Sequence, residues 1–100
     1  MSIFTAKYIF TKEAIQIYAP AAPGVFGLYD SDKIAIYYGK SDYDLKKELF
    51  KHVAGLKGPC TKMALYFNTE IGGSPGKRLK GLLEEHKRVF ENLPRCNQQN

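Results

Sequence analysis

Two runs of alternating side chains, residues 25–29 and 34–38, lie on either side of a short polar segment, residues 30–33. Both runs alternate with a period of two and are rich in β-branched and aromatic residues, which predicts strands. The Asp and Ser side chains between them can accept hydrogen bonds from the backbone of a turn. The pattern therefore predicts a β-hairpin in which Tyr37 and Tyr38 point to opposite faces of a sheet.

Further helix and strand signals extend this hairpin into one α+β domain with a small three-stranded antiparallel sheet and packed helices. Residues 20–100 are expected to form the domain, in the order strand, strand, helix, strand, helix, and residues 1–19 an N-terminal extension that packs on it. Within the extension, residues 3–10 are compatible with a strand or an extended arm. Gly24, at the start of the hairpin, can adopt a backbone conformation closed to other residues. A helix is predicted over residues 12–18, capped by Thr11, with a strand as the alternative. A second helix is predicted from Ser41 or Asp42 to about Val53, ending before Gly55 and Gly58-Pro59, and a strand follows over residues 61–69. The last helix is predicted over residues 77–92, with Ser74 as N-cap and Pro75 at the first helical position.

The net charge of +5 is unevenly distributed. Basic and acidic side chains cancel over residues 1–39, so residues 40–100 carry the whole excess. A basic surface favours partners that bear phosphate, although an ordinary solvated surface explains a charge of this size equally well. No apolar run approaches the ~20 residues of a membrane span. Residues 1–10 contain a lysine and no continuous apolar run, which argues against a signal peptide and favours a cytoplasmic protein.

The chain has two cysteines, Cys60 and Cys96. For a cytoplasmic protein the simplest expectation is that both are reduced thiols. A zinc site with His52 and His86 is the alternative, and the spacings match no zinc finger or ribbon. We therefore expect two free thiols and no zinc.

Two segments of the hairpin, Gly24-Val25-Phe26 and Tyr37-Tyr38-Gly39-Lys40, resemble the two halves of the signature of the GIY-YIG nuclease family. The predicted element order agrees with that family. Glu85 lies nine residues before Pro94-Arg95-Cys96-Asn97, a spacing similar to that between the family's metal-binding glutamate and its closing Pro-Arg-Tyr-Asn turn. The resemblance covers roughly residues 20–97 and is strongest to the nuclease domain of the bacterial excision-repair incision subunit and to small stand-alone members.

The resemblance implies hydrolysis of a phosphodiester with one divalent cation, Mg²⁺ or Mn²⁺. The resemblance implies that Tyr37 activates the attacking water with help from Lys40 and that Glu85 is the metal ligand. It also implies that Asn97 corresponds to the family's terminal asparagine. A phenol titrates near pH ~10 and is a poor base without such help. Without the resemblance, Tyr37 would be interpreted as a half-buried strand residue, and Lys40 and Glu85 as surface residues.

Two site residues depart from the family pattern. Phe26 keeps the aromatic ring of the first motif but lacks its hydroxyl group. Glu48 stands where the family carries an arginine that stabilises charge on phosphate oxygens, so a carboxylate there is expected to repel the substrate. Alternatively, Glu48 pairs with Lys51 or His52 along the helix, or acts as a second metal ligand beside Glu85.

The sequence therefore predicts a GIY-YIG-fold protein that binds nucleic acid, with DNA as the expected partner, and cleaves it weakly or not at all. A divergent metal-dependent endonuclease that uses Tyr37, Lys40 and Glu85 is one alternative, and a protein-interaction module is another. The oligomeric state is left open. The residues expected to contact phosphates are Lys40, Lys46, Lys47, Lys51, Lys77, Arg78 and Arg95.

Overall fold

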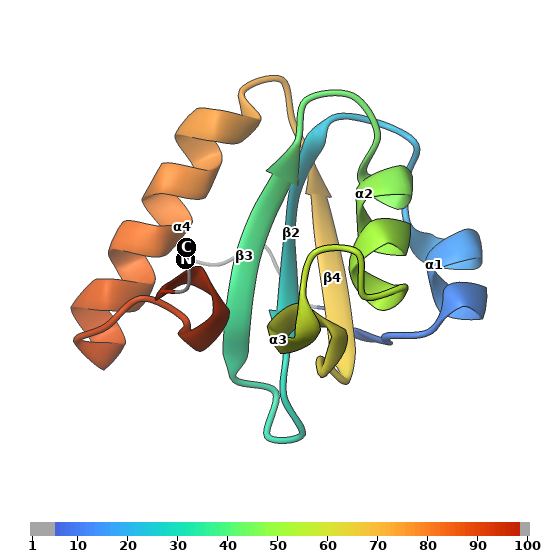
Figure 1. Cartoon of the computed structure of the whole chain (residues 1–100). Helices are drawn as coiled ribbons and strands as arrows, with labels where there is room; N and C mark the ends of the chain where they lie inside the picture. Colours follow the sequence, from blue (N-terminus) through green and yellow to red (C-terminus); the bar gives the residue numbers. More distant parts are fainter. Residues whose placement is uncertain (1–5, 99–100) are drawn as a thin grey trace.

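A computed structural model describes residues 6–98 and contains a four-stranded antiparallel sheet with helices on both faces (Figure 1). The strands lie in the order β1-β4-β2-β3, so the hairpin β2–β3 forms one side of the sheet. In chain order the elements are β1 (Tyr8–Ile9), α1 (Lys12–Tyr18), β2 (Gly24–Tyr29), β3 (Ala35–Ser41), α2 (Leu45–Val53), α3 (Pro59–Lys62), β4 (Tyr66–Ile71), α4 (Pro75–Phe90) and the 3₁₀ turn η1 (Arg95–Gln98).

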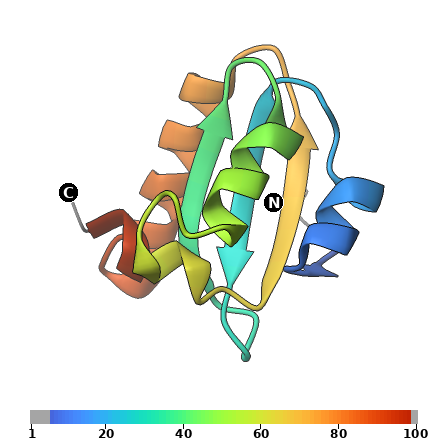
Figure 2. The ribbon, with the colours of Figure 1, turned by 45° about the vertical axis from the view of Figure 1, so that its right-hand side comes forward.

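The sheet separates two layers of helices. Helices α1 and α2 cover one face and α4 covers the other, as the two orientations of the ribbon show (Figures 1 and 2). Side chains alternate along β2, so this strand contributes apolar residues to both faces of the sheet. Phe26 and Leu28 belong to the core under α1 and α2, whereas Val25 packs against Leu82 of α4. We refer below to the α2 face and the α4 face.

The hairpin and its turn are confirmed. The Asp30 carboxylate accepts hydrogen bonds from the backbone N–H groups of Asp32 (2.9 Å) and Ile34 (3.0 Å). Tyr37 packs against the core of the α2 face, and Tyr38 packs against the apolar residues of the α4 face, as alternation predicted. Helix α1 is also confirmed, with the Thr11 hydroxyl accepting from the Ala14 N–H at 3.1 Å.

The sheet has four strands rather than three, because the N-terminal extension contributes a strand. In β1, Tyr8 and Ile9 pair with Phe67 and Tyr66 of β4. Residues 3–5 of the expected strand or arm lie outside the described residues. The extension is therefore an integral part of the sheet, and its pairing with β4 is the part that the sequence did not indicate.

The predicted strand over residues 61–69 is wrong in its first half. Pro59 occupies the first turn of the short helix α3, where its fixed φ angle favours a helical start, and β4 begins only at Tyr66. The apparent alternation that starts at Met63 reflects exposed side chains, since Met63 is 70% exposed and Leu65 is 48% exposed. Alternation alone did not distinguish this helical turn from a strand.

Helix boundaries differ from prediction by a few residues. Asp44 caps α2, accepting from the Lys47 N–H at 3.0 Å, whereas the Ser41 hydroxyl accepts from the N–H of Asp44 itself. Helix α4 begins at Pro75 after Ser74, as predicted, and ends at Phe90 because Glu91 adopts the left-handed conformation (φ 68°).

Gly24 is required for space rather than for an unusual backbone angle. It begins β2 with an ordinary φ angle, and a Cβ atom there would lie 2.1 Å from the carbonyl oxygen of Glu70. The backbone conformation that only glycine can adopt is therefore not used at Gly24. Over residues 6–98, no helix is long and apolar enough to cross a membrane.

Candidate functional site

A cleft of about 410 Å³ opens on the α2 face beside β3. Its lining comes from four separate segments: strand β3 of the hairpin, helix α2, the connection from α2 to β4, and the C-terminal turn η1. The residues that line it include Tyr37, His52, Lys57, Thr61, Cys60 and Cys96. This cleft contains one of the predicted site residues, Tyr37, and borders two more, Phe26 and Glu48, which the following contacts place.

Phe26 lies fully buried beneath the cleft. Its ring centroid is 5.9 Å from that of Tyr37 and 5.3 Å from that of His52, and the latter two rings are 5.2 Å apart. Gly39 makes this packing possible, since a Cβ atom there would lie 2.5 Å from Cζ of Phe26. The ring that replaces the motif tyrosine therefore packs behind Tyr37 and His52, two residues that line the cleft.

Tyr37 is held in its neutral form. Burial raises the pKa of the phenol, and the negative charge of Glu48 raises it further. Both effects oppose formation of a phenolate near pH 7. Activation of water by Tyr37 would therefore need a cation close enough to its hydroxyl group to outweigh the effect of Glu48.

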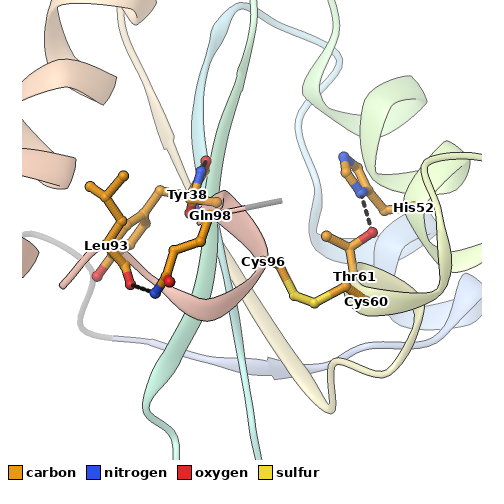
Figure 3. The surroundings of a disulfide bond; sticks show 8 residues. Tyr38, His52, Cys60, Thr61, Leu93, Cys96 and Gln98 are labelled. Carbon is orange, nitrogen blue, oxygen red and sulfur yellow. Dashed lines mark hydrogen bonds between the residues drawn. A yellow bond between two sulfur atoms is a disulfide. The ribbon is translucent and has the colours of Figure 1, made fainter. Parts of the chain in front are cut away.

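His52 is a member of this cleft that sequence reasoning did not assign to it. Nδ1 lies 2.8 Å from the Thr61 hydroxyl, as drawn in Figure 3, and Nε2 lies 3.6 Å from Oε2 of Glu48. Burial is the largest effect on the imidazole and lowers its pKa to about 4, so His52 is neutral at pH 7. Its place four residues after Glu48 on a helix whose apolar stripe is buried was the available signal.

Glu48 forms ion pairs rather than pointing alone into the cleft. Oε1 lies 3.8 Å from Nζ of Lys51, the partner expected at i+3, and Oε2 lies 3.5 Å from Nζ of Lys57. Lys57, in the turn after α2, was not predicted as a site residue. The carboxylate therefore sits between two ammonium groups.

The two cysteines form a disulfide, so the expectation of reduced thiols is wrong. Cys60 at the start of α3 and Cys96 in η1 lie with their sulfur atoms 2.08 Å apart and their Cα atoms 5.7 Å apart (Figure 3). Both residues line the cleft. They are 36 residues apart in the sequence, and only the docking of η1 beside α3 brings them together.

Asn97 explains how η1 is docked. Its Oδ1 accepts from the Tyr38 N–H at 2.9 Å and its Nδ2 donates to the Tyr38 carbonyl oxygen at 3.0 Å. The amide thus pairs with the edge of β3 as a neighbouring strand would. In this structure the predicted site residue Asn97 holds η1, and with it Cys96, against β3.

The other two predicted catalytic residues lie on the α4 face. Lys40 is paired across the sheet with Val25, and its ammonium group lies 2.7 Å from Oδ2 of Asp42. Glu85 is a half-buried residue of α4. Burial raises the pKa of the Tyr38 phenol and the charge of Glu85 adds to that rise, which places Glu85 near Tyr38. The structure therefore groups Phe26, Tyr37 and Glu48 on one face, and Lys40 and Glu85 on the other.

The predicted phosphate-binding residues are divided in the same way. Those of α2 and η1 lie toward the α2 face, and Lys40, Lys77 and Arg78 lie on the α4 side. Several are already engaged: the Lys46 ammonium donates to the Gln16 carbonyl oxygen at 3.0 Å, and Nε of Arg78 donates to both carboxylate oxygens of Glu70 at 3.1 and 2.9 Å. The exposed members of the set are Lys47, Lys77 and Arg95.

Glu85 could hold a divalent cation only together with oxygen atoms from water or substrate. Mg²⁺ prefers six oxygen ligands and is bound through one or two carboxylates completed by water or substrate. Across residues 6–98, no three His, Cys, Asp or Glu side chains gather in a way that could hold a metal. The cysteines form a disulfide and Glu48 is paired with lysines, so neither the zinc alternative nor a Glu48–Glu85 metal pair fits these residues.

The fold is that of GIY-YIG endonuclease domains. One solved structure with this fold is the GIY-YIG N-terminal endonuclease domain of UvrC from Thermotoga maritima, described as a point mutant bound to its catalytic divalent cation. The match has a TM-score of 0.55 with 17% sequence identity, and it covers 81% of this chain and 89% of that domain. No protein-family model matches the chain, and a search of curated proteins finds no match. The similarity is one of fold, and it confirms the fold predicted from the signature segments.

Proposed function

We propose that this protein binds nucleic acid, with DNA as the first expectation, on the α2 face beside the Tyr37 cleft, and that it cleaves phosphodiesters weakly or not at all. One observation carries the proposal: the residues that the signature implies for hydrolysis are divided between two faces of the sheet. Tyr37 and Lys40 lie on opposite faces, and Glu85 belongs to α4, which covers the face of Lys40. A binding surface needs only the cationic rim of the cleft and is unaffected by this division.

The chemistry of the cleft agrees with binding without cleavage. Its histidine is neutral, its tyrosine is kept from ionising, and the carboxylate at the motif position is paired with lysines. We assign no step to a metal ion, and Glu85 with water is expected to bind Mg²⁺ or Mn²⁺ only weakly. A cytoplasmic location remains part of the proposal, but reduced thiols no longer support it.

Fluorescence anisotropy with a labelled 20-base-pair duplex tests the proposal. Binding is expected to be independent of sequence, and the logarithm of the affinity should fall by about 0.9 per neutralised phosphate for each tenfold rise in salt. Arg95→Gln, on η1, should weaken binding, whereas Lys12→Gln, an equal charge change on α1, should not. RNA of the same length separates the two nucleic acids. Lack of binding at ~50 mM salt, where electrostatic binding is strong, would contradict the proposal.

Supercoiled plasmid incubated with Mg²⁺ or Mn²⁺ tests the second half of the proposal. We expect no nicking above that of a Tyr37→Phe variant, which keeps the ring and removes the hydroxyl group. Efficient nicking that Tyr37→Phe and Glu85→Gln both abolish would replace the proposal with the divergent endonuclease.

A further inference from the structure

The turn after α2 returns the chain to the side of the helix that faces the cleft. Gly55 and Gly58 both have positive φ angles, 81° and 102°, which favour glycine. The Leu56 N–H donates to the Lys51 carbonyl oxygen at 2.9 Å, and the Gly58 N–H donates to the Gly55 carbonyl oxygen at 3.2 Å. A Cβ atom at Gly58 would meet open space, so this glycine is needed for its backbone angle. The two glycines thereby place Lys57 beside the last turns of α2.

Lys57 has a defined position and remains accessible. Its Nζ lies 3.5 Å from Oε2 of Glu48, and its side chain, which lines the Tyr37 cleft, is 44% exposed. Because an ammonium group has three N–H donors, Lys57 can contact Glu48 and still donate a hydrogen bond to another oxygen atom. Lys57 is thus a cation at the entrance to the cleft, oriented by a carboxylate.

The charge around Glu48, at the border of the cleft, is consequently positive rather than negative. Glu48 contributes one negative charge, Lys51 and Lys57 contribute two positive charges at 3.8 and 3.5 Å from its carboxylate oxygens, and His52 is neutral. The local sum is therefore positive by one charge. Glu48 alone would repel a phosphate, but together with its two lysines it attracts one.

We propose that Lys57 contacts a phosphate of the bound nucleic acid at the Tyr37 cleft, and that Glu48 is the positioning residue that holds it there. The cation then comes from the turn after α2, instead of from the helix position that Glu48 occupies. This inference rests on the proposed nucleic-acid binding. It also explains why a carboxylate is compatible with a phosphate-binding face.

Duplex binding by Lys57 variants tests the contact. Lys57→Gln should weaken binding of the 20-base-pair duplex roughly 5- to 10-fold at ~0.1 M salt and reduce the salt slope by about 0.9, the value for one phosphate contact. Lys57→Arg should restore affinity to within about twofold, because it keeps the charge. The matched control is Lys62→Gln, an exposed lysine of α3 outside the cleft lining, which should change affinity less than about twofold.

A double-mutant cycle tests the role of Glu48. In a Glu48→Gln background, the effect of Lys57→Gln should shrink to less than about twofold, because the free lysine is no longer held at the cleft. Melting temperatures should be similar throughout, since the pair is partly exposed, with Lys57 44% and Glu48 20% exposed, and such ion pairs contribute little to stability. Equal effects of Lys57→Gln in both backgrounds would overturn the positioning role.

The two proposals fail in different ways. If the wild-type protein binds the duplex and Lys57→Gln changes neither its affinity nor its salt slope, the Lys57 contact is wrong and nucleic-acid binding stands. If the wild-type protein does not bind, both proposals are overturned.

Discussion

The two faces of the sheet are built differently. Under α1 and α2 lies a broad apolar core that includes Ile15, Leu45 and Leu49, each fully buried, and a cleft opens at its edge. On the α4 face the buried apolar cluster contains only Val25 and Leu82 among the described residues. Polar groups also lie on that face, where the buried Tyr29 hydroxyl donates to Oδ1 of Asn68 at 2.9 Å.

This difference indicates which face can support a binding site. The α2 face has a rigid apolar base and a disulfide at its cleft, so its charged residues can be held in place without further support. On the α4 face, polar side chains are engaged with one another, as in the Arg78–Glu70 pair. The signature residues are shared between the faces, and each side has a cleft of about 410 Å³ with lysine in its lining: Lys57 on the α2 face, and Lys40, Lys80 and Lys87 beside α4.

The largest expected effect concerns the disulfide at the α2 face. Chain-entropy models give a cross-link over 36 residues a stabilisation of about 4 kcal/mol, so reduction should lower Tm by roughly 15 °C or more. Amide hydrogen exchange should rise first in α3 and η1 and later in α4. Thermal denaturation with and without dithiothreitol measures the shift.

The Cys60→Ser/Cys96→Ser double variant is the control for this prediction. It should melt like the reduced protein and should not respond to dithiothreitol. If the wild-type Tm is unchanged once thiol labelling shows both cysteines to be free, the cross-link does not stabilise the α2 face.

The two buried histidines, one on each face of the sheet, allow the pH dependence of stability to be compared between the faces. His52 has a pKa of about 4 in the folded protein and about 6.5 in the unfolded chain. Between these two pH values the unfolded chain binds more protons than the folded protein does. The free energy of unfolding therefore falls as the pH falls from about 6.5 to about 4. Between pH 7 and pH 5 this histidine should account for a loss of about 2 kcal/mol. Urea denaturation at both pH values measures it.

His86 on the α4 face provides the matched variant. Burial also lowers its pKa. We expect His52→Gln to remove more of the pH dependence than His86→Gln does. If His52→Gln retains the full loss of stability between the two pH values, His52 is protonated in the folded protein and the account of the cleft is incorrect.

A pair of glycine substitutions gives the smallest expected effects. At Gly39 a Cβ atom would lie 2.5 Å from Cζ of Phe26 and 2.7 Å from Cε2 of Tyr37, so Gly39→Ala should destabilise the protein by about 1–3 kcal/mol through overpacking. At Gly81, in the middle of α4, a Cβ atom would meet open space, and Gly81→Ala should stabilise by about 0.5–1 kcal/mol. Urea midpoints of the two variants should therefore move in opposite directions. A neutral Gly39→Ala would show that the packing of Phe26 and Tyr37 can adjust.

The sequence predicted the local parts of the fold well. The hairpin, the Thr11 cap of α1, and the start of α4 at Ser74-Pro75 each depend on residues within a few positions of one another. It also predicted that Tyr37 and Tyr38 lie on opposite faces, because side chains alternate along any strand. The strand predicted from residue 61 failed where Pro59 and Gly58 favour a helical turn over the extended chain.

Residues that are distant in the sequence were decided by the tertiary structure. Alternation shows that two neighbouring residues face apart, but it does not show which helix covers which face. The sequence could not show that Glu85 would lie near Tyr38 rather than Tyr37, or that Lys57 would pair with Glu48. The Cys60–Cys96 bond has the same origin, since it requires η1 to dock on β3 through Asn97 and no local pattern encodes that docking. Local backbone preferences determined the elements of this protein, and packing across the sheet determined its candidate site.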